Sequence, residues 1–278
     1  MSLIDFLLNI AGLLLWLSWR GVYLPPAATA TPGPLPRRSQ PRAGWGHFLA
    51  RSIYLFALLG LLLGRAFLYC TVGAPLHWEP RIRLNAISLL FYSDWPGRMV
   101  LFSFFSFGVA LAFFYLCLLL LSSVNAAVPD AEPGQRLVRL HLGRLGRWPG
   151  WIKMLLPLFV ITAVWCAVNP LLLWKINMVP PVSPWHLLAQ GAVIGLAFYL
   201  SLKFLVVGFL ALYVLNSYVY LGDSPFLNFV NTTSNSLLRP LRRLPLRLGR
   251  VDLAPLAGMA LVLLVAIKCP EYLDYLRP

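Results

Sequence analysis

The chain has 278 residues, of which 59% are hydrophobic and only 12% are charged, whereas about 25% of the residues of a soluble globular domain are charged. This composition excludes a protein whose main solvent is water. The formal net charge of +14 does not indicate nucleic-acid binding, because the basic residues lie between apolar segments instead of gathering on one soluble face.

Six apolar segments have about the length needed to cross a bilayer as helices, which is about 20 residues. We expect helices at residues 3–19, 47–70, 99–124, 151–174, 185–220 and 253–268. The first is short for a span and could instead lie in the interface; it carries Asp5 in place of the basic start of a signal peptide. The expected fold class is all-α: a polytopic membrane helical bundle of about six transmembrane helices in hairpin repeats, with short interfacial amphipathic helices.

We expect a single membrane domain over residues 1–278. In chain order it consists of an N-terminal hydrophobic helix (1–20), a Pro-rich linker (21–46), helices two and three (47–124), a first hairpin region (125–177) and a second hairpin region (185–270). The linker prediction rests on the sequence PPAATATPGPLPRRSQP, which has too many prolines for a helix and little to bury. Residues 81–92 are apolar enough to lie along the outer membrane surface.

Basic residues are concentrated in alternate loops. The first loop contains Arg20, Arg37, Arg38, Arg42 and Arg51; the third contains Arg136, Arg139, Arg144, Arg147 and Lys153; the fifth contains Arg239, Arg242, Arg243, Arg247 and Arg250. Loops rich in Lys and Arg face the cytoplasm in membrane proteins. The pattern therefore predicts three cytoplasmic loops and both termini on the non-cytoplasmic side.

The third and fifth loops resemble each other. RLVRLHLGRLGRWPGWIKMLLPL, from Arg136, and LLRPLRRLPLRLGRVDLAPLAGM, from Leu237, each combine a Leu/Arg amphipathic turn, a glycine, a basic residue and a Pro-containing start of the next helix. In the second copy the arginines and leucines fall on opposite sides of a helical wheel. This separation predicts a short interfacial helix over residues 235–244.

The second copy also resembles the YggT family of bacterial and plastid membrane proteins. That family has a Leu-Leu-Arg-Pro-hydrophobic-Arg-Arg loop, then Gly-x-hydrophobic-Asp-hydrophobic-Ser-Pro before a helix. The positions that match are Leu237, Leu238, Arg239, Pro240, Arg242, Arg243, Gly249, Asp252, Leu253 and Pro255, while Ala254 replaces the usual Ser. The resemblance covers residues 228–261. The copy near residues 136–158 is degenerate, because it lacks the Arg-Pro step and the Asp.

The resemblance implies a location in the bacterial inner membrane and an assembly, scaffold or accessory role, without a defined chemistry. Anionic lipid head groups and other membrane proteins are the expected partners. The candidate lipid- or partner-binding residues are Arg239, Arg242, Arg243, Arg247, Arg136, Arg139, Arg144 and Arg147. Pro240, Gly249, Asp252 and Pro255 are expected to be structural, with the Asp252 carboxylate capping the last helix.

Two ionisable side chains lie inside apolar segments. Arg65 is close enough to the end of its helix for the side chain to snorkel to the interface. Lys203 lies deeper, and with Asn169, which precedes the helix-breaking Pro170, it could line a transport path. A structural lysine and a packing kink are the simpler interpretation. The alternative function is therefore a small ion or solute transporter or channel.

The sequence contains no pattern typical of an enzyme or a cofactor site. There is no Ser-His-Asp order, HExxH motif, paired carboxylates or phosphate-binding glycine loop, and the histidines are not paired for haem. The four cysteines, Cys70, Cys117, Cys166 and Cys269, show neither CxxC nor zinc-site spacing. We therefore expect no enzymatic activity, no cofactor and no metal site, although an enzyme with convergent groups at the inner interface is a third alternative.

Overall fold

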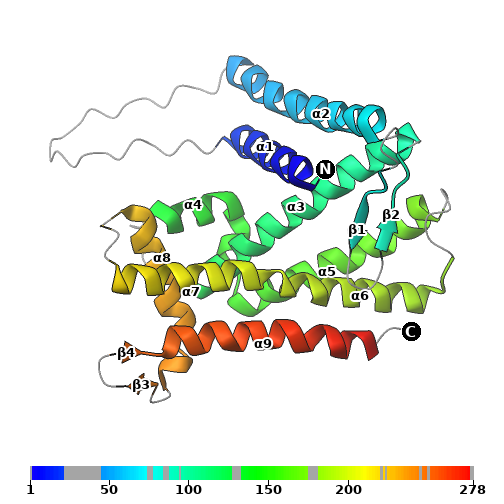
Figure 1. Ribbon diagram of the computed structural model, residues 1–278. Helices are drawn as coiled ribbons and strands as arrows, with labels where there is room; N and C mark the ends of the chain where they lie inside the picture. Colours follow the sequence, from blue (N-terminus) through cyan, green and yellow to red (C-terminus); the bar gives the residue numbers. More distant parts are fainter. Residues whose placement is uncertain are drawn as a thin grey trace. The chain divides into compact units, whose positions relative to one another are not determined.

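The computed structural model describes residues 2–21, 45–73, 78–83, 88–93, 95–126, 133–174, 181–219, 222, 224–243, 246–248 and 251–275. Most of these residues are helical (Figure 1). The helices fold into two compact units, one formed by Met1–Pro80 and Phe91–Leu111 and the other by Arg81–Leu90 and Ala112–Pro278. Most of the expected linker, residues 21–46, lies outside the described residues.

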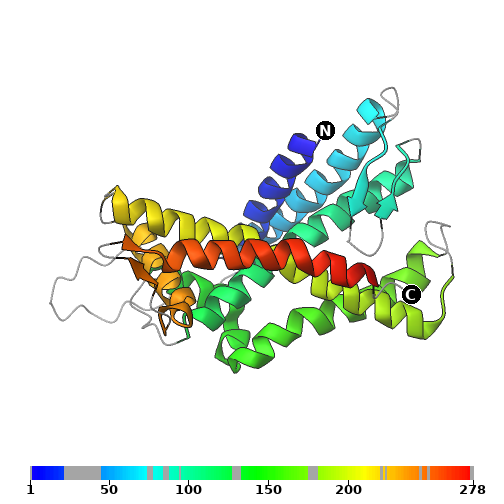
Figure 2. The ribbon, with the colours of Figure 1, turned by 60° about the horizontal axis from the view of Figure 1, so that its bottom comes forward.

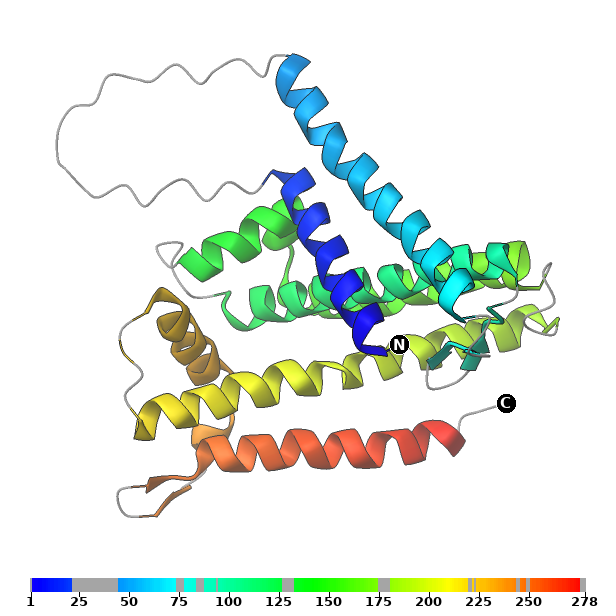
Figure 3. The ribbon, with the colours of Figure 1, turned by 45° about the horizontal axis from the view of Figure 1, so that its top comes forward.

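The first unit contains helices α1 (Ser2–Arg20) and α2 (Trp45–Gly73) and the beginning of α3 (Pro96–Val124). Helices α1 and α2 lie side by side (Figure 3). Leu58 and Leu62 of α2 form a buried cluster with Phe107 of α3. A Cβ atom at Gly12 would lie 2.8 Å from the Phe107 ring, so the glycine lets α1 approach α3 closely.

The segment that was expected along the outer membrane surface contains a short β-hairpin. Strands β1 (Arg81–Arg83) and β2 (Ser88–Leu90) pair antiparallel, with Ile82 opposite Leu89. Residues 84–87 lie outside the described residues, and the location of the hairpin relative to a membrane stays a prediction.

The second unit contains the rest of α3 and the elements that follow it. These are α4 (Pro133–Leu142), η1 (Gly143–Arg147), α5 (Gly150–Val168), the π-helical turn η2 (Asn169–Leu173), α6 (Pro184–Leu200), α7 (Leu202–Tyr218), α8 (Pro225–Leu238), η3 (Leu241–Arg243), β3 (Arg247–Leu248), β4 (Val251–Asp252) and α9 (Ala254–Tyr275). Helices α6 and α7 follow each other with a single residue, Ser201, between them. Helix α9 packs along α7 (Figures 1 and 3).

Helices α5 and α6 pack through small residues spaced four apart. A Cβ atom at Gly195 would lie 2.7 Å from the Leu158 side chain, and one at Gly191 would lie 3.2 Å from the Thr162 backbone. In membranes such Gly-x-x-x-Gly spacings allow two helix backbones to approach closely, because little hydrophobic force acts between helices in lipid. The two glycines therefore determine where α6 contacts α5.

Five described helical stretches are long and apolar enough to cross a membrane: Leu3–Arg20, Ser52–Gly73, Pro96–Val124, Gly150–Leu171 and Pro184–Tyr218. A sixth, Ala254–Cys269, is apolar but shorter. Many of their large apolar side chains are exposed, such as Phe204 at 72%, as expected for surfaces that contact lipid. These findings confirm the all-α membrane helical bundle, and a helix covers most of each of the six predicted segments.

The predicted helix over residues 235–244 was wrong in its boundaries. Helix α8 begins ten residues earlier, at Pro225, and ends at Leu238, and a separate 3-10 turn covers Leu241–Arg243. Pro240 explains the break, because proline has no N–H for the helical hydrogen bond and its ring clashes with the preceding turn.

Candidate functional site

The two basic loops of the second unit meet at one end of that unit. Helices α4 and α8 contact each other, and Figure 2 shows both at the end opposite to the C-terminal end of α9. Phe229 of α8 packs against Val138 and Leu142 of α4. A Cβ atom at Gly134 would lie only 2.5 Å from the Phe229 ring, so this contact requires a residue without a side chain.

Buried polar side chains join the same two loops. The Asn125 side-chain amide donates a hydrogen bond to the Thr233 hydroxyl (2.7 Å), and the Gln135 side-chain amide donates to the Asn125 carbonyl (3.1 Å). All three side chains are at most 1% exposed. Hydrogen bonds in a low-dielectric interior are strong and costly to break, so the two copies of the repeated motif are held together as one body.

The predicted arginines of the first copy surround one surface hollow of about 980 Å³. Its lining consists of Arg136, Arg139, Leu140, Gly143, Arg144, Gly146 and Arg147. Helix α4 buries Val138 and Leu142 on its opposite side. Gly143 has a φ of +54°, which favours glycine, and there the chain leaves α4. The turn brings Arg144 and Arg147 to the same hollow as Arg136 and Arg139.

Lys153, which the sequence analysis counted as a loop charge, is buried. Its side chain is 4% exposed and its ammonium donates hydrogen bonds to the Ser122 hydroxyl (2.9 Å) and the Gly146 carbonyl (2.7 Å). Because Gly146 lines the arginine hollow, Lys153 connects the wall of the hollow to α3 and to the first turn of α5.

The arginines of the second copy are exposed around the end of α8. Arg239, Arg242 and Arg243 all face solvent, and the Arg242 guanidinium donates hydrogen bonds to the Asn235 side-chain oxygen (2.6 Å) and the Tyr213 hydroxyl (3.1 Å). Arg247 lies in β3, and Gly249 lies outside the described residues.

The structural residues of the second copy lie at the start of α9. The Asp252 carboxylate accepts a hydrogen bond from the N–H of Ala254, the first residue of α9 (3.0 Å), as expected of a cap. Pro255 is buried in the first turn of α9, where proline is tolerated because its missing N–H would have no helical partner. Pro240 lies in the exposed turn after α8.

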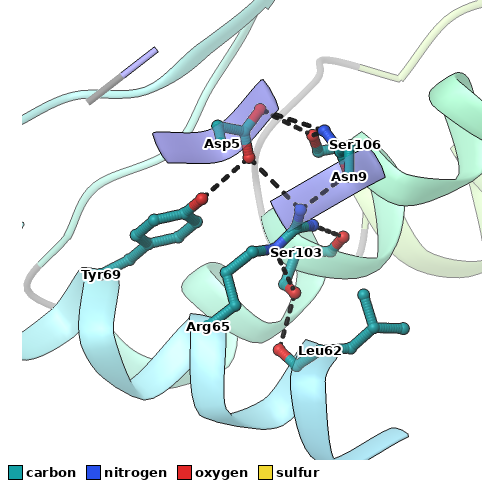
Figure 4. Close-up of polar contacts among 7 residues, drawn as sticks. All are labelled: Asp5, Asn9, Leu62, Arg65, Tyr69, Ser103 and Ser106. Carbon is teal, nitrogen blue, oxygen red and sulfur yellow. Dashed lines mark hydrogen bonds and ion pairs between the residues drawn. The ribbon is translucent and has the colours of Figure 1, made fainter. Parts of the chain in front are cut away.

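Arg65 does not snorkel, and that prediction was wrong. Its side chain is 1% exposed and lies 3.4 Å from the Asp5 carboxylate of α1, which is 22% exposed. The guanidinium also donates to the Asn9 side-chain oxygen (2.7 Å), to the Ser103 hydroxyl (3.0 Å) and to the Ser103 carbonyl. Figure 4 shows this ion pair between α1 and α2, with α3 supplying the serine.

The carboxylate side of this pair is equally well satisfied. Asp5 accepts hydrogen bonds from the Tyr69 hydroxyl (2.9 Å) and the Ser106 hydroxyl (3.0 Å). Sequence reasoning missed the arrangement, although one signal was present. Asp5 lies near the beginning of the first apolar helix and Arg65 near the end of the second. If the two helices form an antiparallel hairpin, these ends lie side by side and the two charges can meet.

The transport-path residues have different surroundings. Lys203 is half-buried at the start of α7, with its ammonium 5.2 Å from the Phe204 ring centroid. Asn169 is 3% exposed and begins the π-helical turn, so the predicted interruption before Pro170 is present. Among the described residues the Asn169 side-chain nitrogen has no hydrogen-bond partner. Within the same residues, no group of three or more His, Cys, Asp or Glu could hold a metal ion.

Comparison with known proteins identifies one region. A family model described as CCB3/YggT matches residues 190–268, which extend from α6 to α9 and include the second copy of the basic motif. The match confirms the resemblance drawn from that motif, and it does not extend to the degenerate copy near residues 136–158. Neither the curated proteins nor the solved structures contain a match.

Proposed function

Since a family model described as CCB3/YggT matches residues 190–268, we propose that the protein is a non-enzymatic membrane accessory, scaffold or assembly protein. It binds protein partners and anionic lipids through its two Arg-rich loops. The observation that supports this function most is the packing of the two loops into one body through Asn125, Thr233 and the contact between Gly134 and Phe229. A joined basic surface presents more charge to one partner than either loop alone.

The charge on this surface is sufficient to matter for binding. Each Lys or Arg near an anionic leaflet contributes about 1 kcal/mol of attraction, so three arginines contribute about 3 kcal/mol, reduced by salt. In the proposed orientation, residues 126–150 and 223–250 face the cytoplasm of a bacterial inner membrane, and both termini lie on the other side. The positive-inside distribution of Lys and Arg supports that orientation.

A small ion or solute transporter is the second candidate. It is favoured by the π-helical turn that starts at the buried Asn169, since such turns often mark functional sites. Lys203 would then contribute to a path through the membrane. Solute uptake that is lost in Lys203→Gln, with normal insertion of the variant, would favour this candidate over the first.

The test of the proposed function is co-purification in mild detergent at low salt. The variant Arg239→Gln/Arg242→Gln/Arg243→Gln removes three exposed charges and is expected to insert normally but to lose an anionic lipid or a protein partner. Tyr213→Phe is the control, because it removes one hydrogen-bond acceptor of Arg242 and leaves the charge unchanged. If the triple variant keeps every lipid and protein that the wild type binds, these arginines are only orientation signals and the proposal fails.

A further inference from the structure

The arginine hollow, lined by Arg136, Arg139, Arg144 and Arg147 with Leu140, Gly143 and Gly146, has the composition of an anion-binding site. Among the residues that the structure describes, none in this lining is acidic. Arginine suits this task because its planar guanidinium donates two parallel hydrogen bonds to a phosphate and stays charged. Arg136, Arg144 and Arg147 are exposed, so an anion can reach them without a rearrangement of the fold.

The size and charge of the hollow favour more than one phosphate group. Its volume of about 980 Å³ is at the upper end of the roughly 300–1,000 Å³ of ligand sites. A single phosphodiester carries one negative charge and would leave most of the charge of four arginines uncompensated. A ligand with two phosphate groups balances more of it and can engage arginines from both α4 and η1.

The surroundings of the hollow indicate a lipid as the source of these phosphates. The hollow adjoins the start of α5, a candidate membrane span, because the buried Lys153 ammonium in the first turn of α5 binds the Gly146 carbonyl. Trp148 and Trp151, at the same start, are 44% and 67% exposed. Exposed tryptophans at the end of a span are typical of the head-group level of the membrane. Leu140, 49% exposed, supplies an apolar edge.

We propose that the arginine hollow binds the head group of a phospholipid that carries two phosphate groups. The proposal rests on the proposed function, which places this loop at an anionic membrane surface, and it specifies the ligand class of that surface. The hollow of the first copy then distinguishes between anionic lipids, while the exposed arginines of the second copy attract all of them alike.

The experiment uses the full-length protein in phosphatidylcholine nanodiscs that contain diphosphatidylglycerol or, at equal total charge, twice as much phosphatidylglycerol. Lipids that stay bound after extraction are counted by native mass spectrometry. We expect the wild type to retain the two-phosphate lipid about tenfold better, the equivalent of about one strong hydrogen bond to a charged group. Arg136→Gln/Arg144→Gln/Arg147→Gln should lose this preference.

The matched control is Arg239→Gln/Arg242→Gln/Arg243→Gln, which removes the same charge from the other loop. It should bind less of both anionic lipids, as the proposed function requires, but keep the preference between them. If the triple variant is not recovered in folded form, the single substitution Arg144→Gln, at an exposed residue, should still reduce the preference. A second arm adds sodium pyrophosphate, which should compete only weakly, because it lacks the acyl chains and glycerol that keep a lipid at the interface.

Four results would overturn the proposal. Equal retention of both lipids by the wild type, or equal loss of preference in both triple variants, would show that the hollow has no selectivity, while the proposed function would stand on general attraction. Tight pyrophosphate binding without a lipid preference would assign the hollow to soluble phosphates. If no anionic lipid and no protein co-purifies with the wild type at low salt, the proposed function fails as well.

Discussion

Replacing Arg65 should destabilise the hairpin of α1 and α2 far more than replacing an exposed arginine. In Arg65→Met the Asp5 carboxylate loses the guanidinium at 3.4 Å. Removing one partner of a buried pair costs about 3–5 kcal/mol, and we expect about 3 kcal/mol here, because the Asp5 side chain keeps 22% exposure. The loss arises from the stranded carboxylate and not from lost volume.

The assay is the free energy of unfolding in bicelles, measured for Arg65→Met, Asp5→Asn and the double variant. Because the double variant has no unpaired charge, its loss of free energy of unfolding should be about 2 kcal/mol smaller than the summed losses of the two single variants. Arg20→Gln, an exposed arginine at the end of α1, is the control and should change stability by no more than about 0.5 kcal/mol. Additive single effects, or an Arg65→Met loss as small as that of Arg20→Gln, would refute the buried pair.

Two further substitutions test the second unit. Gly134→Ala should lower the free energy of unfolding by about 1–3 kcal/mol, because its Cβ would overlap the Phe229 ring. The control Gly60→Ala, whose Cβ would meet nothing within 4 Å, should not lower it. Equal effects of the two substitutions in a bicelle unfolding assay would contradict the α4–α8 contact. Asp252→Ala should lower the free energy of unfolding by about 1 kcal/mol, because the Ala254 N–H loses its cap. Asp252→Asn should lower it much less, since the Asn side chain can also cap. Equal losses in the two variants would argue against capping.

The helices could be predicted from the sequence because lipid leaves little choice of structure. A run of about 20 apolar residues must satisfy its own backbone hydrogen bonds, and only a helix does so within one segment. The cap by Asp252 was also predictable, because it depends only on the residues next to it. Both features depend only on residues that are close together in the sequence.

Contacts between distant segments were not predictable in the same way. Whether Arg65 snorkels or is buried depends on Asp5, Asn9 and Ser103, which lie on two other helices. The sequence places Lys153 among the loop charges, but its ammonium binds the Ser122 hydroxyl and the Gly146 carbonyl. In each case the partner comes from a part of the chain whose position a single sequence does not specify.

The boundaries of α8 could have been predicted better from local chemistry alone. Ser224 accepts a hydrogen bond from the Leu227 N–H (3.2 Å) and precedes Pro225, which is a common start of a helix. The end at Leu238 follows from Pro240. The separation of arginines from leucines indicates an amphipathic surface, whereas the Ser224-Pro225 start and Pro240 indicate where the helix begins and ends.

Both basic loops should face the cytoplasm, and labelling of single cysteines in intact bacterial cells measures on which side each loop lies. The four native cysteines are replaced first, and one cysteine is then placed at the exposed Arg144 of η1 or at the exposed Pro181 before α6. An impermeant thiol reagent should modify Pro181→Cys in intact cells and Arg144→Cys only after permeabilisation. Modification of Arg144→Cys in intact cells, with Pro181→Cys protected, would contradict this orientation.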